Sequence, residues 1–284
     1  MSTVFRLFSR CPLWLLHGLG AVLGWLSFVF SATYRRRFVA NAARAGYTFA
    51  QVRGAVAHAG RMTAELPRLW LGAPVPVEWV GTPCVDAAYA AGKGVLFLTP
   101  HMGCFEVTAQ GLAQRYSAGF GPITVLYRPA RQAWLSDVME GSRQRPGLET
   151  APTTLAGVRQ MIKALRAGRA IGLLPDQVPP DGMGQWAPFF GQPAYTMTLG
   201  ARLALQTGAT VLLVWGERLP WGRGFRLHFS ALQAPLAREL DAAVAQINGE
   251  MERLIRACPQ QYLWGYARYK APRVESAPAG KDGA

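Results

Sequence analysis

The chain has 284 residues and half of them are hydrophobic, so it can bury a substantial core and is not disordered as a whole. Its net charge of +14 at neutral pH comes from 30 Lys and Arg, 26 of them arginine, against 16 Asp and Glu. Because arginine grips phosphate and carboxylate groups through paired donors, we expect an anionic partner: nucleic acid, acidic lipid headgroups, a phosphorylated substrate or an acidic carrier protein. The four cysteines are far apart, which argues against a disulfide framework or a structural zinc site and favours reduced thiols in a cytosol-facing protein.

A membrane anchor is the first element that the sequence predicts. Residues 11–32 carry no formal charge, and as a helix they would be about 33 Å long, enough to cross a hydrocarbon layer of about 30 Å. A cleaved signal peptide is disfavoured because such peptides have a shorter apolar core, and because Arg35–Arg37 follow this segment at once, which opposes export. A buried helix of a soluble protein is disfavoured because it would show one polar face, and this segment shows almost none. Since Arg35–Arg37 and Arg44 outnumber Arg6 and Arg10, the positive-inside rule places the rest of the protein in the cytoplasm. A helix lying within one leaflet is the alternative to a spanning one.

After the anchor the sequence pattern is first helical, and from about residue 75 strand-like and helix-like segments alternate. Residues 38–70 predict helices, and residues 275–284 read as a disordered tail. Short apolar runs predict buried strands at 94–99, 123–127, 170–174 and 210–215, and the segments between and after them predict helices at about 104–116, 132–144, 153–167, 197–207 and 239–257. We therefore expect an α/β domain with an at least partly parallel central sheet, arranged as an anchor over 1–34, the α/β domain over 35–273 and a tail over 274–284.

Polar residues follow three of these predicted strands. His101 and Glu106 come after the first strand, Arg128 after the second, and Asp176 with Gln177 after the third. Ligands of such sheets bind beyond the carboxyl ends of the strands, so these residues are expected to share one edge.

The pair His101 and Glu106 is the predicted catalytic pair. If a helix begins near Gly103 or Cys104, its first turn brings the Glu106 carboxylate back beside the imidazole, where a carboxylate fixes the tautomer and makes the ring a general base. The chain contains no G-x-S-x-G elbow, so the hydroxyl to be activated would belong to a bound substrate.

Other residues admit two interpretations. Cys104 is either a nucleophile near His101 or a small packing residue, and the second is favoured. Arg128 and Arg143 are candidate anion binders, although an arginine is often a solvated surface group. Asp176 would hold an arginine or a substrate hydroxyl, or would merely cap a turn. The remaining histidines, at positions 17, 58 and 228, are expected to be structural.

Several blocks resemble the late acyltransferases of lipid A biosynthesis, within the wider lysophospholipid acyltransferase group. The resemblance covers most of the chain: the N-terminal anchor with its basic residues, "PHMGCFE" as an H-x4-D/E block, "VLYRPAR", "LLPDQVPPDGMGQWAPFFGQPAYTMTLGARLA" and "PQQYLWGYARYK". The H-x4-D/E block is shared among glycerolipid acyltransferases, whereas the segment that begins "LLPDQ" and the block "PQQYLWGYARYK" are much more specific to this branch.

The resemblance implies a glycerolipid-acyltransferase-like mixed sheet flanked by helices and transfer of a fatty acyl chain to a hydroxyl of a lipid A precursor. The donor would be an acyl carrier protein thioester or acyl-CoA, without an acyl-enzyme, a metal or another cofactor. His101 and Glu106 map to the catalytic dyad. Arg128, Arg143, Asp176 and Gln177 map to substrate-binding positions, with Arg145 close enough to compete with Arg143. The implied setting is the bacterial inner membrane, with the catalytic domain facing the cytoplasm and with acyl carrier protein and membrane lipids as partners.

Departures from the family pattern leave the acceptor open. Cys104 and Phe105 stand where many relatives have Asn-Trp, and Val178 stands where some have an acidic residue. An acyltransferase that uses a lysophospholipid or another glycolipid is the enzymatic alternative, and a membrane-anchored protein that binds anionic lipids is the non-enzymatic one. Nucleic-acid binding is less favoured because no recognised motif accompanies the charge.

Overall fold

The computed structural model describes residues 2–127 and 146–273. The predicted helix at 132–144 and the predicted tail lie outside these ranges. The described N-terminal part is entirely helical, which confirms the helices predicted over 38–70. Its helices are α1 (Ser2–Ser9), α2 (Leu13–Phe30), α3 (Ala32–Arg44), α4 (Phe49–Val52), α5 (Gly54–Ala64) and α6 (Leu66–Leu71).

A seven-stranded sheet forms the centre of the molecule. Its strands are β1 (Val77–Val80), β2 (Val95–Leu98), β3 (Ile123–Tyr127), β4 (Leu148–Pro152), β5 (Ala170–Leu173), β8 (Thr210–Arg218) and β9 (Phe225–Ala231), in the order β1-β9-β8-β2-β5-β3-β4. All neighbours pair in parallel except β8 and β9, which are antiparallel. The sheet is therefore mixed and flanked by helices, as predicted.

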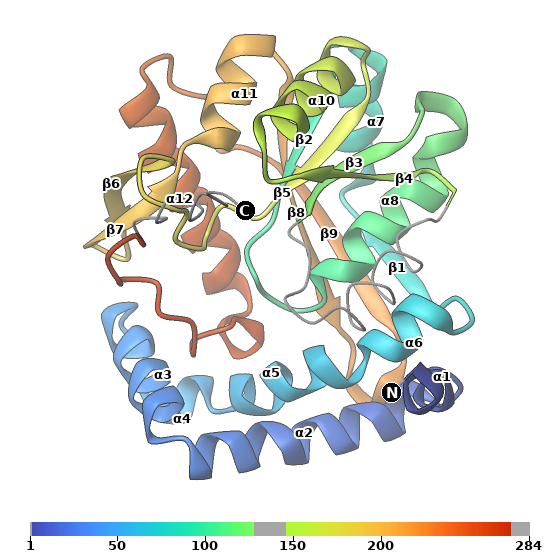
Figure 1. Ribbon diagram of the computed structural model, residues 1–284, viewed down its shortest axis with the longest axis vertical. Coiled ribbons are helices and arrows are strands. Elements are labelled where there is room, and N and C mark those ends of the chain that lie inside the picture. The colour runs from blue at the N-terminus through green and yellow to red at the C-terminus, as the bar shows by residue number, and fades with distance from the viewer. Residues whose placement is uncertain (1, 128–145, 274–284) are drawn as a thin grey trace, which may run out of the picture.

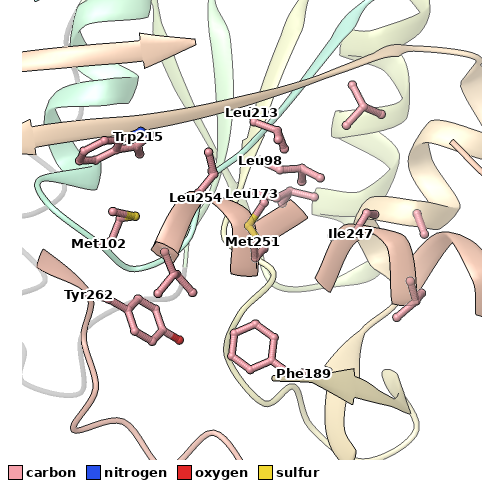
Figure 2. Close-up of a cluster of buried hydrophobic side chains, with 14 of the residues drawn as sticks. Leu98, Met102, Leu173, Phe189, Leu213, Trp215, Ile247, Met251, Leu254 and Tyr262 are labelled. Carbon is pink, nitrogen blue, oxygen red and sulfur yellow. The ribbon is translucent and has the colours of Figure 1, made fainter. Parts of the chain in front are cut away.

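Each face of the sheet carries its own apolar cluster, because successive strand side chains point to opposite faces. On β2, Val95 and Phe97 join α7 (Thr82–Ala90) and α8 (Phe105–Phe120), whereas Leu96 and Leu98 join the cluster containing α10 (Leu155–Arg166), α11 (Leu199–Thr207) and α12 (Leu240–Ala257). Figure 2 shows part of the second cluster, where Met251 and Leu254 of α12 lie near Leu98 and Leu173. Burial of β2 on both faces explains its uninterrupted apolar sequence.

A separate hairpin of β6 (Gly184–Phe189) and β7 (Gln192–Met197) packs against α12. The C-terminal W-x3-R block holds this hairpin in place. The fully buried Arg268 donates from Nη1 to the Tyr195 carbonyl oxygen and from Nη2 to Thr196 Oγ1, both at 2.7 Å, while Trp264 is buried in the same region. In the described structure, these two motif residues thus have a positioning role.

Helices α2 and α5 run side by side beneath the sheet (Figure 1). Their backbones approach closely because glycines face each other: a Cβ on Gly60 of α5 would collide with the backbone of Gly20 and Gly24 of α2. Within the described residues, α2 is the one helix that is long and apolar enough to cross a membrane, and 33% of its residues are buried. The structure thus contains the predicted apolar helix and places one side of it against the rest of the protein.

Candidate functional site

A tight loop joins β2 to α8 and carries His101. Gly103 in this loop has φ +55°, a conformation that favours glycine, and a side chain there would collide with the Gly216 carbonyl oxygen. The loop backbone is tied to its surroundings: Gly103 N donates to Gln261 O at 2.8 Å and Cys104 N donates to Gly216 O at 2.7 Å. The position of His101 is therefore set by a loop with little freedom.

Asp176 binds His101 through both of its carboxylate oxygens. His101 Nδ1 lies 2.6 Å from Asp176 Oδ1, and the His101 backbone N–H donates to Oδ2 at 2.9 Å. Burial raises the pKa of Asp176, but the His101 ring and its hydrogen bonds outweigh this effect and lower that pKa below its ordinary value. An ionised carboxylate only accepts, so Nδ1 carries a proton, and in the neutral form of the ring Nε2 is the nitrogen with a free lone pair.

Glu106 lies in the first turn of α8, directly after the loop that carries His101. Its Oε2 accepts a hydrogen bond from Trp70 Nε1 at 3.2 Å. Trp70 belongs to α6 and is buried, and its ring contacts the ring of Phe5 in α1 with centroids 5.9 Å apart. The N-terminal helices thus contact the Glu106 carboxylate directly, through Trp70 of α6.

An apolar cavity of about 200 Å³ opens beside these groups. His101, Phe105 and Glu106 line one part of it, and the remainder lies between α8 and strands β3 and β5. The apolar side chains of its wall include Leu112, Ile123, Val125, Leu126, Leu173 and Val214. Gly172 on β5 also lines the cavity and leaves space that a side chain would fill, since a Cβ there would meet only Val125 Cγ1 at 3.4 Å. The site therefore combines polar groups on one part of the cavity wall with an apolar remainder suited to a hydrocarbon chain.

Beneath the loop lies a buried ionic network. Arg218, at the end of β8, donates to Glu65 from Nε at 2.7 Å and from Nη2 at 2.5 Å, and Nη2 also donates to the Gly103 carbonyl oxygen at 3.0 Å. Glu65 Oε2 lies 2.9 Å from Nε2 of His17 on α2. Burial alone would raise the pKa of Glu65, but the Arg218 guanidinium outweighs it and lowers that pKa to about 2. The network thus connects α2 to the loop that holds His101.

Replacing Glu65 with glutamine is expected to destabilise the protein by about 3–5 kcal/mol, because it leaves the buried Arg218 charge without its counter-ion. Chemical unfolding of the purified protein measures this change. Since the pKa of Glu65 falls from 4.5 to about 2 on folding, its contribution is complete above pH 4.5 and is lost as the pH falls towards 2. Glu65→Gln should therefore also flatten the acid limb of the stability profile.

Glu149→Gln is the matched control for that change. Glu149 pairs with Arg169 at 3.3 Å, but its side chain is 40% exposed, so its loss should cost less than about 1 kcal/mol. Equal effects of the two substitutions would show that the buried network is not the stabilising element that its geometry indicates.

Cys104 and the other histidines have structural surroundings. Burial raises the pKa of the Cys104 thiol well above its ordinary value, and the side chain packs in the apolar cluster under α8, which does not favour a nucleophile. His17 contacts Glu65, His58 Nδ1 lies 3.0 Å from Arg218 Nη1, and His228 Nε2 lies 2.8 Å from Glu217 Oε2.

The structure thus brings together three of the predicted site residues, His101, Glu106 and Asp176. The carboxylate on the His101 ring is that of Asp176, which was expected to hold an arginine or a substrate hydroxyl or to cap a turn, while Glu106 accepts from Trp70. Gln177 follows Asp176 in the turn after β5 and is half-buried. Arg128, Arg143 and Arg145 lie outside the described residues. Among residues 2–127 and 146–273, no group of three or more His, Cys, Asp or Glu side chains is placed to hold a metal ion.

Three supporting residues were not predicted: Trp70, Glu65 and Arg218. Arg218 follows the apolar run 210–215, so the rule that polar residues follow strands would have singled it out. Trp70 and Glu65 lie in a helical stretch whose sequence gives no sign of its distant partners.

Comparison with known proteins identifies the family. The model of the bacterial lipid A biosynthesis acyltransferase family matches residues 14–271, which is nearly the whole chain. The chain belongs to this family. The match includes the loop of His101 and Glu106, Asp176 and the C-terminal block of Trp264 and Arg268.

Three individual relatives share between 24% and 29% of the aligned residues with this chain. The chain is 27% identical over 190 residues to the lipid A biosynthesis palmitoleoyltransferase of Escherichia coli K12, covering 66% of this chain and 59% of that protein. It is 24% identical over 204 residues to the lipid A biosynthesis lauroyltransferase of the same organism, covering 71% and 64%. A phosphatidylinositol mannoside acyltransferase of Mycobacterium tuberculosis (strain CDC 1551 / Oshkosh) is 29% identical over 144 residues, covering 49% and 44%. The chain thus matches less than two thirds of the length of these relatives.

Proposed function

We propose that this protein is an O-acyltransferase that moves a fatty acyl chain from an acyl carrier protein thioester, or from acyl-CoA, to a hydroxyl of a lipid A precursor. The proposed setting is the inner membrane, with the site on the cytoplasmic side. The observation that carries the proposal is the Asp176-bound imidazole of His101 in the lining of an apolar cavity. Membership of the family supports the reaction class, and the names of the two Escherichia coli relatives support the lipid A acceptor.

The proposed reaction is a direct transfer. His101 Nε2 removes the proton from the acceptor hydroxyl as its oxygen attacks the thioester carbonyl carbon. The tetrahedral intermediate then collapses, the carbon–sulfur bond breaks, and the departing sulfur receives the proton from His101. Backbone N–H groups at the start of α8 are the proposed donors to the oxyanion. The Asp176 carboxylate stabilises the imidazolium that forms, and Glu106 on the cavity wall completes the proposed catalytic set.

Acyl transfer by the purified protein tests this function. The protein would be incubated with labelled acyl carrier protein thioester or acyl-CoA and, separately, with a lipid A precursor, a lysophospholipid or a phosphatidylinositol mannoside. We expect the acylated lipid A precursor, identified by mass spectrometry. Transfer to another acceptor alone would overturn the acceptor assignment, and no transfer from either donor to any acceptor would overturn the reaction class.

Trp70→Phe should lower kcat about 10- to 100-fold with little change in KM, because it removes one hydrogen bond to Glu106 while keeping an aromatic side chain at that position. Initial rates at several acceptor concentrations separate the two constants. Trp186→Phe is the control, since Trp186 is 55% exposed on the hairpin. If both variants keep the parent kcat, Trp70 does not position Glu106 for the reaction.

Gly172→Leu should shift donor preference towards shorter acyl chains, because the new side chain occupies space in the cavity proposed to hold the chain. We expect kcat/KM for a long-chain donor to fall at least about tenfold relative to a short-chain donor. The measurement is a competition between donors of different length. Gly249→Leu, at an open position on α12, should leave the ratio unchanged. A ratio unaffected by Gly172→Leu would place the acyl chain elsewhere.

A further inference from the structure

The outer side of α2 is apolar and exposed along its whole length. Its segment from Leu13 to Phe30 contains no Asp, Glu, Lys or Arg. We define the α2 face as the side chains of Trp14, Leu19, Val22, Leu23, Leu26 and Phe30, which are between 43% and 81% exposed. A continuous apolar surface of this kind is unusual on a protein surrounded by water and needs an apolar partner.

The inner side of α2 is fixed to the protein. His17 is buried and contacts Glu65, and the backbone of Gly24 lies against that of Val56 on α5. Arg61 Nε of α5 also donates to the His17 carbonyl oxygen at 3.3 Å. A helix that crossed a bilayer would either leave these partners or carry them with it. The first would expose His17 to hydrocarbon and strip Glu65 of a contact, and the second would take Arg61 and Glu65 into the membrane.

Basic residues flank the α2 face at both ends. Arg6 and Arg10 precede the helix and are exposed, and Arg35, Arg36 and Arg37 follow it and are exposed. Near the start of α2, the backbone of Gly222 packs against Trp14, and the adjacent Trp221 is 89% exposed. Arginine and tryptophan are the residues that favour the headgroup region of an anionic bilayer.

We propose that the protein binds an anionic bilayer through the α2 face, with α2 lying in the plane of one leaflet and not crossing it. The apolar side chains enter the acyl-chain region, the flanking arginines meet anionic headgroups, and α5 with the site above it stays on the aqueous side. This arrangement rests on the proposed membrane location, but not on the identity of the acyl acceptor.

Vesicle binding by the full chain tests the surface. Co-sedimentation would be measured with phosphatidylglycerol-containing and pure phosphatidylcholine vesicles, without acyl donor or acceptor, so that failure of acyl transfer does not affect the result. We expect Leu23→Glu and Leu26→Glu to weaken binding at least about tenfold and phosphatidylglycerol to strengthen it. Leu155→Glu, at a 77% exposed position on α10, is the control and should bind like the parent. Unchanged binding of Leu23→Glu and Leu26→Glu, or a soluble dimer through this face in place of vesicle binding, would overturn the proposal.

Labelling depth distinguishes an in-plane helix from a spanning one. Single cysteines at Trp14, Val22 and Phe30, in a chain whose partly exposed Cys11, Cys84 and Cys258 are serine, would carry a fluorophore quenched by shallow or deep spin-labelled lipids. Similar depths at all three positions are expected for a helix in the plane. A label at Val22 that is much deeper than the labels at Trp14 and Phe30 would establish a spanning helix and overturn the proposal.

Discussion

Replacing His101 with alanine is expected to lower kcat by a factor of about 10³ to 10⁴, because the proposed reaction loses the group that takes the proton from the acceptor hydroxyl. The assay is acyl transfer under saturating donor and acceptor, with circular dichroism and thermal unfolding to establish that the variant is folded. Removal of the ring leaves the buried Asp176 carboxylate without its Nδ1 partner, so the variant should also lose stability, and the assay is run well below its unfolding temperature.

His228→Ala is the matched control for that loss. His228 also contacts a carboxylate, that of Glu217 at 2.8 Å, but it lies on β9 with its ring stacked on Trp215. It should keep most of the parent turnover. A His101→Ala variant that retains turnover comparable to His228→Ala would exclude His101 as the base.

Asp176→Asn is expected to lower kcat by a factor of about 10² to 10⁴ while the fold is kept. The asparagine oxygen can still accept the His101 backbone N–H, but its NH₂ group then faces Nδ1 and donates to it. The ring is driven to the tautomer with the proton on Nε2, which can no longer accept one from the substrate. Steady-state kinetics together with the pH dependence of kcat measures the change.

Glu106→Gln, compared with Asp176→Asn, shows which of the two carboxylates controls the protonation of His101. It keeps an oxygen that can accept from Trp70 and removes the charge beside the cavity. The tautomer argument applies to Asp176 alone, so Asp176→Asn should change the pH profile of kcat and Glu106→Gln should change it less. Asp181→Asn, at an exposed turn, should resemble the parent. If Asp176→Asn leaves both kcat and the pH profile intact, Asp176 is not the carboxylate that governs the histidine.

The central strands were predictable because burial on both faces leaves an uninterrupted apolar run. The edge strands β1 and β4 are half-exposed, and β4 includes Pro152, so their sequences contain no such run. The hairpin strands β6 and β7 contain Pro188 and Pro193 and are only partly buried. In β9, buried Phe225, Leu227 and Phe229 alternate with less buried residues, a strand pattern that the sequence does contain.

The candidate site was predictable where chain topology alone decides it. His101 and Asp176 follow β2 and β5, which are parallel neighbours, so the ends of these strands must meet. Which carboxylate reaches the ring depends on side-chain packing, and a spacing of five residues between His101 and Glu106 cannot reveal that Trp70 lies beside Glu106. The network of Glu65 and Arg218 joins residues 153 positions apart, and only the folded structure brings them together.

The close packing of Gly20 and Gly24 on Gly60 has a practical consequence for producing this protein. Deleting residues before α3, a common way to make an anchored enzyme soluble, would uncover the side of α5 that packs against α2 and leave Glu65 without His17. The shortened chain would then expose the side of α5 that α2 covers, which is prone to aggregation, in place of the α2 face. Polar substitutions confined to the outward side chains of α2 preserve those helix contacts, and they are the better route to a detergent-free sample.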